Sequence, residues 1–328
     1  MLILAIPYVF ILFIMIYRID YRISTPGDLT DISQYIELEA DTYPQENAIS
    51  SIYVMSIPRP TFFQFMFSTL SPSHTQTQIS PAQRQISDTA NFRSGQVARN
   101  TSIDASFITS LEALDMTIQY EEQRIVRLIY NYMEGDIEIG DIVLSVNGFD
   151  EISEGLNAVE CGEYGLFEIE REDEIKTVEV KRQENDGRCV FGITLATYYK
   201  ITETEIPLDV QTSLVGGPSG GLMQTLYIYN ALSEFDFTNG IQITGTGTIN
   251  IDGTTGSVGS VREKVFTAHN KGADVFFVPK TGATNDNYST ALSAKEELSQ
   301  TSLTIVGVAH FSDVLNWLMA HHGEAIDE

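Results

Sequence analysis

A glycine-rich loop in the C-terminal half of the chain constrains the fold most. Residues 215–223 read Val-Gly-Gly-Pro-Ser-Gly-Gly-Leu-Met, which places a serine between glycines directly ahead of a helical apolar pattern. Glycines let the backbone N–H groups at a helix start gather around the serine hydroxyl, where the oxyanion of an acyl transfer would form. Ser219 is therefore a candidate nucleophile, and the backbone of Gly217 and Gly220 is a candidate oxyanion loop. A plain turn with a helix-capping serine fits the same stretch.

A lysine further along the chain supplies a partner for this serine. The sequence Ser-Val-Arg-Glu over residues 260–263 is a capping box that predicts a helix start, so Lys264 falls in the first turn. Val261 and Ala268 share its helix face, which predicts that the amine is buried near the positive end of the helix dipole. Both effects lower the pKa of a lysine, and a neutral amine can accept a serine proton. The alternative is a lysine that extends to solvent.

Three motifs in this half of the chain form a more specific pattern together than any of them does alone. They are Gly217-Pro-Ser-Gly-Gly221, Ile243-Thr-Gly-Thr-Gly-Thr-Ile249, and Gly259-Ser-Val-Arg-Glu-Lys264 followed by Ala268-His269. This combination resembles the proteolytic domain of Lon-type Ser-Lys proteases. The resemblance implies an α/β (α+β) fold in which Ser219 is the nucleophile, Lys264 is the general base, and Thr244 orients the lysine amine.

Two residues depart from the Lon pattern. Gly220 stands where alanine is usual, which is a small change. Gly216 stands where cytosolic Lon enzymes carry an acidic residue, which suggests the Lon-like branch that lacks an ATPase. The sequence holds no Gly-x-x-x-x-Gly-Lys-Ser/Thr motif, so no P-loop motor is evident in these residues. We also expect no cofactor and no metal.

The N-terminal end of the sequence is strongly apolar. Leu2 to Tyr17 is an uninterrupted run of 16 apolar or aromatic residues, close to the shortest helix that spans a bilayer. We therefore predict a transmembrane helix over residues 1–18 and a linker over residues 19–34. Arg18 and Arg22 would keep the rest of the chain in the cytoplasm by the positive-inside rule. The Lon-like resemblance implies the extracellular side instead, and that orientation is the one we expect.

A β-rich module is predicted over residues 121–198. The run Gly140-Asp-Ile-Val-Leu-Ser-Val-Asn-Gly148 is similar to the PDZ-domain signature of a strand that enters a tight Asn-Gly turn. A PDZ domain binds an extended peptide as an added strand, but the expected carboxylate loop at residues 119–123 has no glycine. Peptide binding and a spacer role therefore both fit this module.

The PDZ-like module is predicted to be inserted into the protease domain. Residues 35–120 supply strands and a helix that the Lon fold needs, and residues 199–328 supply the serine and lysine motifs. Residues 71–102 are rich in Ser, Thr, Gln and Pro, so a mobile, mostly solvated connection with at most one short helix is predicted there. A helix that Asp104 caps is predicted to follow, to about Tyr120. The whole arrangement resembles the membrane-anchored, PDZ-containing Lon-like proteases of Gram-positive bacteria. The resemblance implies cleavage of exported peptides or membrane-tethered proteins, including precursors of peptide signals, and allows ring-shaped oligomers.

Charge restricts the partners of the chain. The sequence has 45 acidic and 19 basic residues, a net charge of −26, so phosphate backbones would be repelled and a nucleic-acid role is excluded. Residues 111–200 hold 21 acidic and 8 basic residues, about half of the excess. They form either a solvated acidic surface or one that attracts cationic peptides.

Other interpretations of the sequence remain. Ser219, Asp286 and His310 stand in the chain order of an α/β-hydrolase esterase, although a PDZ-like module precedes the serine where that fold needs parallel strands. A membrane-tethered PDZ scaffold with an inert protease domain is a second alternative. Cys161 and Cys189, the only cysteines, fit either one disulfide or two separate thiols.

Overall fold

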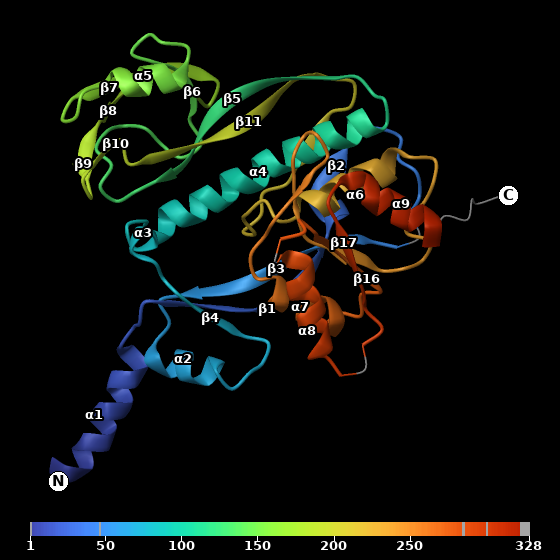
Figure 1. Ribbon diagram of the computed structural model, residues 1–328, viewed down its shortest axis with the longest axis horizontal. Helices are drawn as coiled ribbons and strands as arrows, with labels where there is room; N and C mark the ends of the chain where they lie inside the picture. The colour runs from blue at the N-terminus through green and yellow to red at the C-terminus, as the bar shows by residue number, and fades with distance from the viewer. Residues whose placement is uncertain (1, 46, 284–285, 300, 322–328) are drawn as a thin grey trace. The chain divides into compact units, whose positions relative to one another are not determined.

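The computed structural model describes residues 2–45, 47–283, 286–299 and 301–321 (Figure 1). The chain divides into two compact units. Unit 1 comprises residues 1–80, 208–211 and 219–328, and unit 2 comprises residues 81–207 and 212–218. Unit 2 thus interrupts unit 1 in the sequence. Its first residue lies well before residue 121, where the PDZ-like module was predicted to begin.

Unit 1 is an α/β structure built on a six-stranded sheet. The strand order is β17-β16-β13-β3-β1-β4, and pairing is parallel from β17 to β3 and antiparallel from β3 to β4. The strands of this sheet are β1 (Tyr21–Asp31), β3 (Ile49–Pro58), β4 (Thr75–Gln78), β13 (Ile243–Gly245), β16 (Val275–Pro279) and β17 (Thr304–Val308). The shorter elements are η1 (Ile32–Gln34), β2 (Ile36–Leu38), β12 (Leu208–Val210), β14 (Thr248–Ile249) and β15 (Thr255–Gly256).

Helices cover both faces of this sheet because β16 is apolar on each side. Phe276 and Val278 pack with helices α7 (Val261–Asn270) and α8 (Asn287–Glu296) in one buried core. Phe277, which alternates with them, makes an edge-to-face contact with Trp317 of α9 (Phe311–His321). Helix α9 also contacts α6 (Gly221–Leu232). The continuous apolar strand with helices on either face confirms the predicted α/β class.

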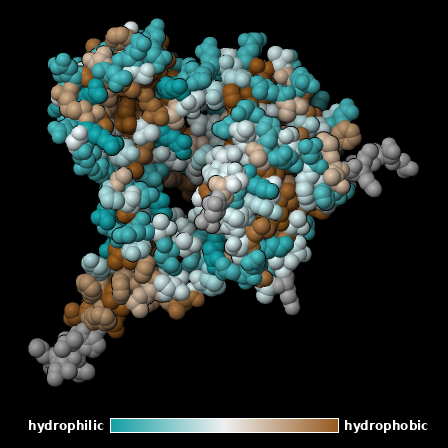
Figure 2. Space-filling view, viewed as in Figure 1, coloured by the Kyte–Doolittle hydropathy of each residue, from teal (hydrophilic) through white to brown (hydrophobic). Residues whose placement is uncertain are grey.

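The N-terminal segment differs from its prediction. Helix α1 (Leu2–Ile16) has 15 residues, and no helix among the described residues is both long and apolar enough to span a membrane, so the predicted transmembrane helix is not found. Residues 19–34 are not a linker, because they contain β1 and η1. Exposed apolar side chains do gather on α1 and on the neighbouring α2 (Phe62–Ser68), as Figure 2 shows.

Unit 2 combines an antiparallel sheet with one long helix. The sheet order is β11-β5-β6-β7-β8, and the buried core on it includes Val126, Val143, Phe167 and Ile169. Helix α4 packs against β5 and β11. The elements are α3 (Pro81–Arg84), α4 (Asp88–Ala113), β5 (Ile118–Ile129), β6 (Ile142–Val146), α5 (Ile152–Ala158), β7 (Tyr164–Arg171), β8 (Glu174–Lys181), β9 (Gln183–Asn185), β10 (Arg188–Val190) and β11 (Ile193–Thr204).

Predictions for the segment before unit 2 and for unit 2 itself can be compared with the structure. Helix α4 begins at Asp88 behind the cap residue Ser87, so the predicted Asp104 cap is wrong, and the predicted connection over residues 71–102 is wrong from residue 88 onward. Residues 71–87 are mostly exposed or half-buried and include the short helix α3, in agreement with the prediction. The tight turn after β6 is confirmed, since Asn147 and Gly148 have φ of 51° and 77°, a left-handed pair that asparagine and glycine favour.

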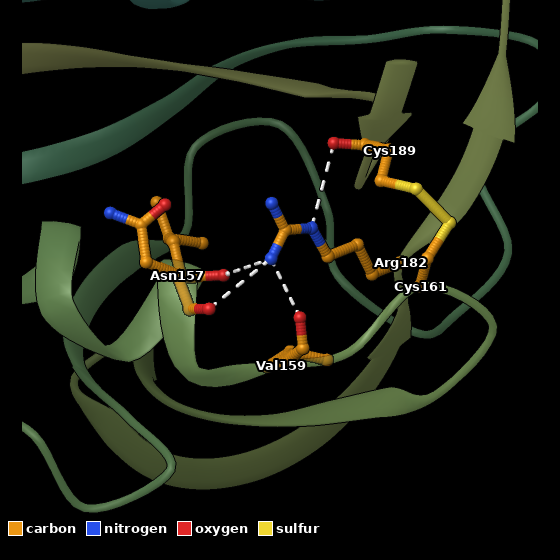
Figure 3. The surroundings of a disulfide bond; sticks show 6 residues. Asn157, Val159, Cys161, Arg182 and Cys189 are labelled. Atoms are coloured by element: carbon orange, nitrogen blue, oxygen red, sulfur yellow. Dashed lines mark hydrogen bonds between the residues drawn. A yellow bond between two sulfur atoms is a disulfide. The ribbon is translucent and has the colours of Figure 1, made fainter. Parts of the chain in front are cut away.

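A disulfide joins Cys161 to Cys189 and settles the question that the sequence left open. The Arg182 side chain lies beside it and donates to the backbone carbonyl groups of Leu156, Asn157 and Val159 at the C-terminal end of α5 and to that of Cys189 (Figure 3). These carbonyl groups at a helix end need donors, and the guanidinium supplies several at once. The disulfide and Arg182 together connect α5 to the β9–β10 hairpin.

Candidate active site

Ser219 lies immediately before helix α6. Gly220 is the N-cap residue of this helix, and the Ser219 side chain is only partly exposed. The Ser219 carbonyl oxygen accepts hydrogen bonds from Thr246 Oγ1 at 3.0 Å and from Gly247 N at 2.9 Å. The nucleophile candidate is therefore held by the segment that follows β13 and projects from the positive end of a helix dipole.

Lys264 lies in the first turn of α7, as predicted, but the helix start differs from the predicted one. Ser260 adopts a left-handed conformation, with φ of 57°, and its side chain makes no capping hydrogen bond, so the capping box does not form. Glu263 is buried, and its Oε1 has no hydrogen-bond partner among the residues that the structure describes. The side chain of Lys264 is buried too, with only 3% of its surface exposed.

The amine of Lys264 contacts two hydroxyl groups. Its Nζ donates to Ser219 Oγ at 2.8 Å and to Thr246 Oγ1 at 2.7 Å. Burial lowers the pKa of Lys264 from its ordinary value of 10.5 to about 7, while the nearby carboxylate of Glu263 acts in the opposite direction. A lysine with this pKa is about half neutral at pH 7 and can take a proton from a hydroxyl group at this distance.

Thr246, and not Thr244, is the threonine that contacts the lysine. Thr244 Oγ1 donates to the Ser50 backbone carbonyl at 2.9 Å inside the sheet, and therefore supports the pairing of β13 with β3. The two threonines stand on either side of Gly245, where β13 ends. The repeated Thr-Gly pattern offered no signal to separate them, because side chains two residues apart point to the same face of an extended strand.

The predicted oxyanion loop presents two backbone donors. Gly217 N donates to the Gly95 carbonyl oxygen at 2.7 Å, so this N–H group is already engaged. The N–H groups of Ser219 and Gly220 have no hydrogen-bond partner among the described residues. Because they belong to the start of α6, they are the donors that remain for an oxyanion formed at Ser219.

A buried polar side chain that the sequence analysis did not single out, that of Gln224, lies close to Gly220. Gln224 is buried, its backbone N–H donates to the Gly220 carbonyl oxygen, and its side chain donates to the Tyr35 hydroxyl group at 3.4 Å. The Tyr35 hydroxyl group lies 3.2 Å from Ser51 Oγ on β3. A buried glutamine one turn after the glycine loop is the signal in the sequence that could have pointed to this group.

The esterase triad is not assembled in this structure. Asp286 caps α8 by accepting from Ser289 N at 2.9 Å, and it also accepts from two further backbone N–H groups. His310 Nε2 lies 2.7 Å from the Asp252 carbonyl oxygen, and Nδ1 lies 2.9 Å from Ser312 Oγ. Both side chains therefore hold loops and helix starts, and the amine of Lys264 occupies the position beside Ser219 Oγ.

Comparison with known proteins bears on the C-terminal part of the chain. Residues 197–321 match the C-terminal proteolytic domain of Lon protease (S16), a range that includes Ser219, Thr246 and Lys264. A Lon protease of Mycoplasmopsis agalactiae is 28% identical over 144 residues, which cover 42% of this chain and 13% of that protein. The matched part of the chain thus spans about an eighth of the length of this relative. These matches support a serine peptidase.

Proposed function

We propose that the chain is a serine endopeptidase in which Ser219 is the nucleophile and Lys264 is the general base, and that cleavage requires no ATP. The observation that carries the proposal is the 2.8 Å contact between Lys264 Nζ and Ser219 Oγ, made by an amine whose burial lowers its pKa to about 7. Gly216, which stands where cytosolic Lon enzymes carry an acidic residue, supports the ATP-independent part.

The proposed reaction begins with proton transfer from Ser219 Oγ to the neutral amine of Lys264. The oxygen attacks the scissile carbonyl carbon, and the N–H groups of Ser219 and Gly220 stabilise the oxyanion of the tetrahedral intermediate. The resulting ammonium gives its proton to the leaving amine, which leaves an ester on Ser219. Lys264 then takes a proton from water, and the hydroxide attacks the carbonyl carbon of the ester. When this second tetrahedral intermediate collapses, the carboxylic acid product leaves and the Lys264 ammonium returns its proton to Ser219 Oγ. Throughout, the hydroxyl group of Thr246 keeps Nζ in place.

We extend the proposal to the substrates and the location. The substrates are exported peptides or membrane-tethered proteins, and the enzyme cleaves them at the outer face of the cell membrane. The disulfide between Cys161 and Cys189 supports an oxidising compartment. The exposed apolar side chains of α1 and α2 support contact with a membrane. The acidic residues of unit 2 favour cationic peptides, and its PDZ-like sheet offers edges to which a peptide could be added.

Peptide cleavage by the full-length chain tests the chemical part of the proposal. Ser219→Ala and Lys264→Ala are each expected to lower the turnover number by at least about 10³-fold, since each removes a member of a unit that acts together. His310→Ala serves as the control and keeps the wild-type rate, because the ring nitrogens of His310 lie against Asp252 and Ser312, while Ser219 Oγ is contacted by Lys264. Cleavage at the wild-type rate by either Ser219→Ala or Lys264→Ala refutes the assignment of the dyad. Loss of activity in His310→Ala would favour the esterase alternative.

A separate experiment tests the location. The full-length chain is expected to float with vesicles that contain anionic lipid, because the apolar residues of α1 and α2 adjoin Arg18 and Arg59. Failure to float would remove the membrane part of the proposal and leave the peptidase part intact. Comparison of peptides released by cells with the wild-type chain and with Ser219→Ala would then identify substrates.

A further inference from the structure

Helix α4 makes three contacts with the loop that leads into Ser219, and all of them lie within unit 2. The loop N–H of Gly217 donates to the Gly95 carbonyl oxygen at 2.7 Å. Ser102 Oγ donates to the Pro218 carbonyl oxygen at 3.2 Å. Gly216 packs against Gly95 so closely that a Cβ atom on Gly216 would lie 2.9 Å from the Gly95 carbonyl carbon. Residues 216–218 are each therefore held by the same helix.

Ser102 is distinguished from the other buried hydroxyl residues of α4. Ser106, Thr109 and Ser110 each donate to the carbonyl group four residues earlier in their own helix. This is the usual arrangement for a hydroxyl residue inside a helix. Ser102 is also buried, but its hydroxyl group donates out of the helix to the Pro218 carbonyl oxygen. The direction of this hydrogen bond marks Ser102 as a residue that holds the loop.

The Pro218 carbonyl group is in the same peptide plane as the Ser219 N–H group. A trans peptide bond is planar, so the C=O and N–H bonds point in opposite directions and turn together. A donor that fixes the Pro218 carbonyl oxygen therefore also fixes the direction of the Ser219 N–H. This N–H is one of the two donors that remain for the oxyanion, and its usefulness depends strongly on its direction.

We propose that Ser102 is a positioning residue that aims the Ser219 N–H at the oxyanion through the Pro218 carbonyl group, and that Gly216 seats the loop on Gly95. The inference rests on the proposed function, in which Ser219 forms a tetrahedral intermediate. Neither Ser102 nor Gly216 touches the substrate carbonyl in this proposal. Their effect is confined to the transition state, because the oxyanion exists there and not in the bound substrate.

The first test uses Ser102→Ala in the 328-residue chain, with Ser110→Ala as the matched control. Titration of Ser219 with a fluorophosphonate counts the working active sites of each variant. Per working site, Ser102→Ala is expected to lower the turnover number by about 10- to 100-fold, somewhat less than complete loss of one oxyanion donor. KM stays within about twofold, since the substrate carbonyl is not yet an oxyanion. The affinity for a peptide aldehyde, which forms a tetrahedral adduct with Ser219, falls by the same factor as kcat/KM. Ser110→Ala leaves all three quantities unchanged.

Further variants separate positioning from general damage. Ser102→Thr retains a hydroxyl group and is expected to recover most of the turnover number. Gly216→Ala lowers it more than Gly95→Ala does, because a Cβ on Gly95 would meet Gly216 at an ordinary 3.5 Å. The inference is overturned if Ser102→Ala acts only by reducing the number of titratable sites, raises KM instead, or changes nothing while Ser219→Ala is inactive. If Ser219→Ala itself remains active, the proposed function fails, and the inference fails with it.

Discussion

The pH dependence of cleavage follows directly from the burial of Lys264. Its pKa of about 7 means that about one tenth of the amine is neutral at pH 6, one half at pH 7 and nine tenths at pH 8. We expect kcat/KM to rise nearly tenfold from pH 6 to pH 8 and to reach a plateau above pH 8.5. For a solvated lysine with a pKa of 10.5, the neutral fraction below pH 7 would be about 3,000-fold smaller, and the rate would climb to pH 10.

The assay is the initial rate of cleavage of a peptide without ionisable groups near the scissile bond, from pH 5.5 to 10. Reaction of Ser219 with a fluorophosphonate, followed over the same range, reports the nucleophile without any leaving-group step. A flat profile between pH 6 and 9, or one that rises tenfold per unit up to pH 10, would refute the reasoning. A flat profile would show that no lysine base titrates between pH 6 and pH 9. A profile that rises up to pH 10 would show that Lys264 is solvated.

The variant Glu263→Gln provides a second test, because the structure predicts the direction in which the midpoint of the pH profile moves. The carboxylate of Glu263 opposes the effect of burial on the pKa of Lys264, so its removal is expected to move the midpoint of the profile to lower pH. A midpoint that moves to higher pH would contradict the assigned electrostatics. The substitution preserves the size of a side chain that is 1% exposed, which limits repacking.

The same burial gives a stability difference of known sign. The unfolded chain binds a proton at Lys264 between about pH 7 and pH 10.5, and the folded chain does not, so this contribution to the free energy of unfolding rises with pH in that window. From pH 7 to pH 9 the rise is about 2 kcal/mol. Lys264→Met is expected to remove it, and urea denaturation of both chains at the two pH values measures the difference. An equal rise in both chains would refute the burial.

Three further outcomes are expected. Thr246→Val lowers kcat/KM by about 10- to 100-fold because the lysine amine loses its second hydroxyl contact, whereas Thr244→Val changes it by less than about threefold; steady-state kinetics measure both. Replacement of both Cys161 and Cys189 by alanine lowers the free energy of unfolding of unit 2 by about 3.5 kcal/mol, judged by urea denaturation, since the bond closes a separation of 28 residues. Burial raises the pKa of Asp104 to about 6, so between about pH 4 and pH 6 the folded chain retains a proton that the unfolded chain loses. The free energy of unfolding therefore falls by about 3 kcal/mol as the pH rises through that window. Asp104→Asn should abolish this fall when both chains are denatured with urea at the same pH values.

Sequence patterns predicted the parts of the site that depend on local chemistry. A serine among glycines at a helix start and a lysine on an apolar helix face are visible in the sequence, and the structure places their side chains 2.8 Å apart. Thr246 was missed because the choice between two equivalent threonines depends on where β13 ends, which is set by pairing with β3 and β16. Long-range pairing of this kind leaves no mark in the local sequence.

The sequence patterns did not predict the first half of helix α4, for a different reason. Its first turns are mostly exposed, and its buried face further along is made of Ala98, Arg99, Ser102 and Ser106 beside only a few large apolar residues. A hydrophobic periodicity therefore cannot report this helix, although its small residues are what allow a loop to approach it closely. The predicted capping box failed because Ser260 adopts a left-handed conformation, which a sequence pattern does not reveal, and its side chain makes no capping hydrogen bond.

The state of Lys264 is best understood as a consequence of how α7 packs. Val261, Val265 and Ala268 are almost completely buried beneath the sheet, and Lys264 lies among them on a helix whose other contacts fix its rotation. An amine held there loses its water, and the loss of water dominates the pKa even though the carboxylate of Glu263 acts against it. No cation is needed nearby to make the base neutral. The apolar residues that stabilise the helix thus also prepare its lysine for proton transfer, and any substitution that lets water reach α7 should raise the pKa of Lys264 before it disturbs the dyad distance.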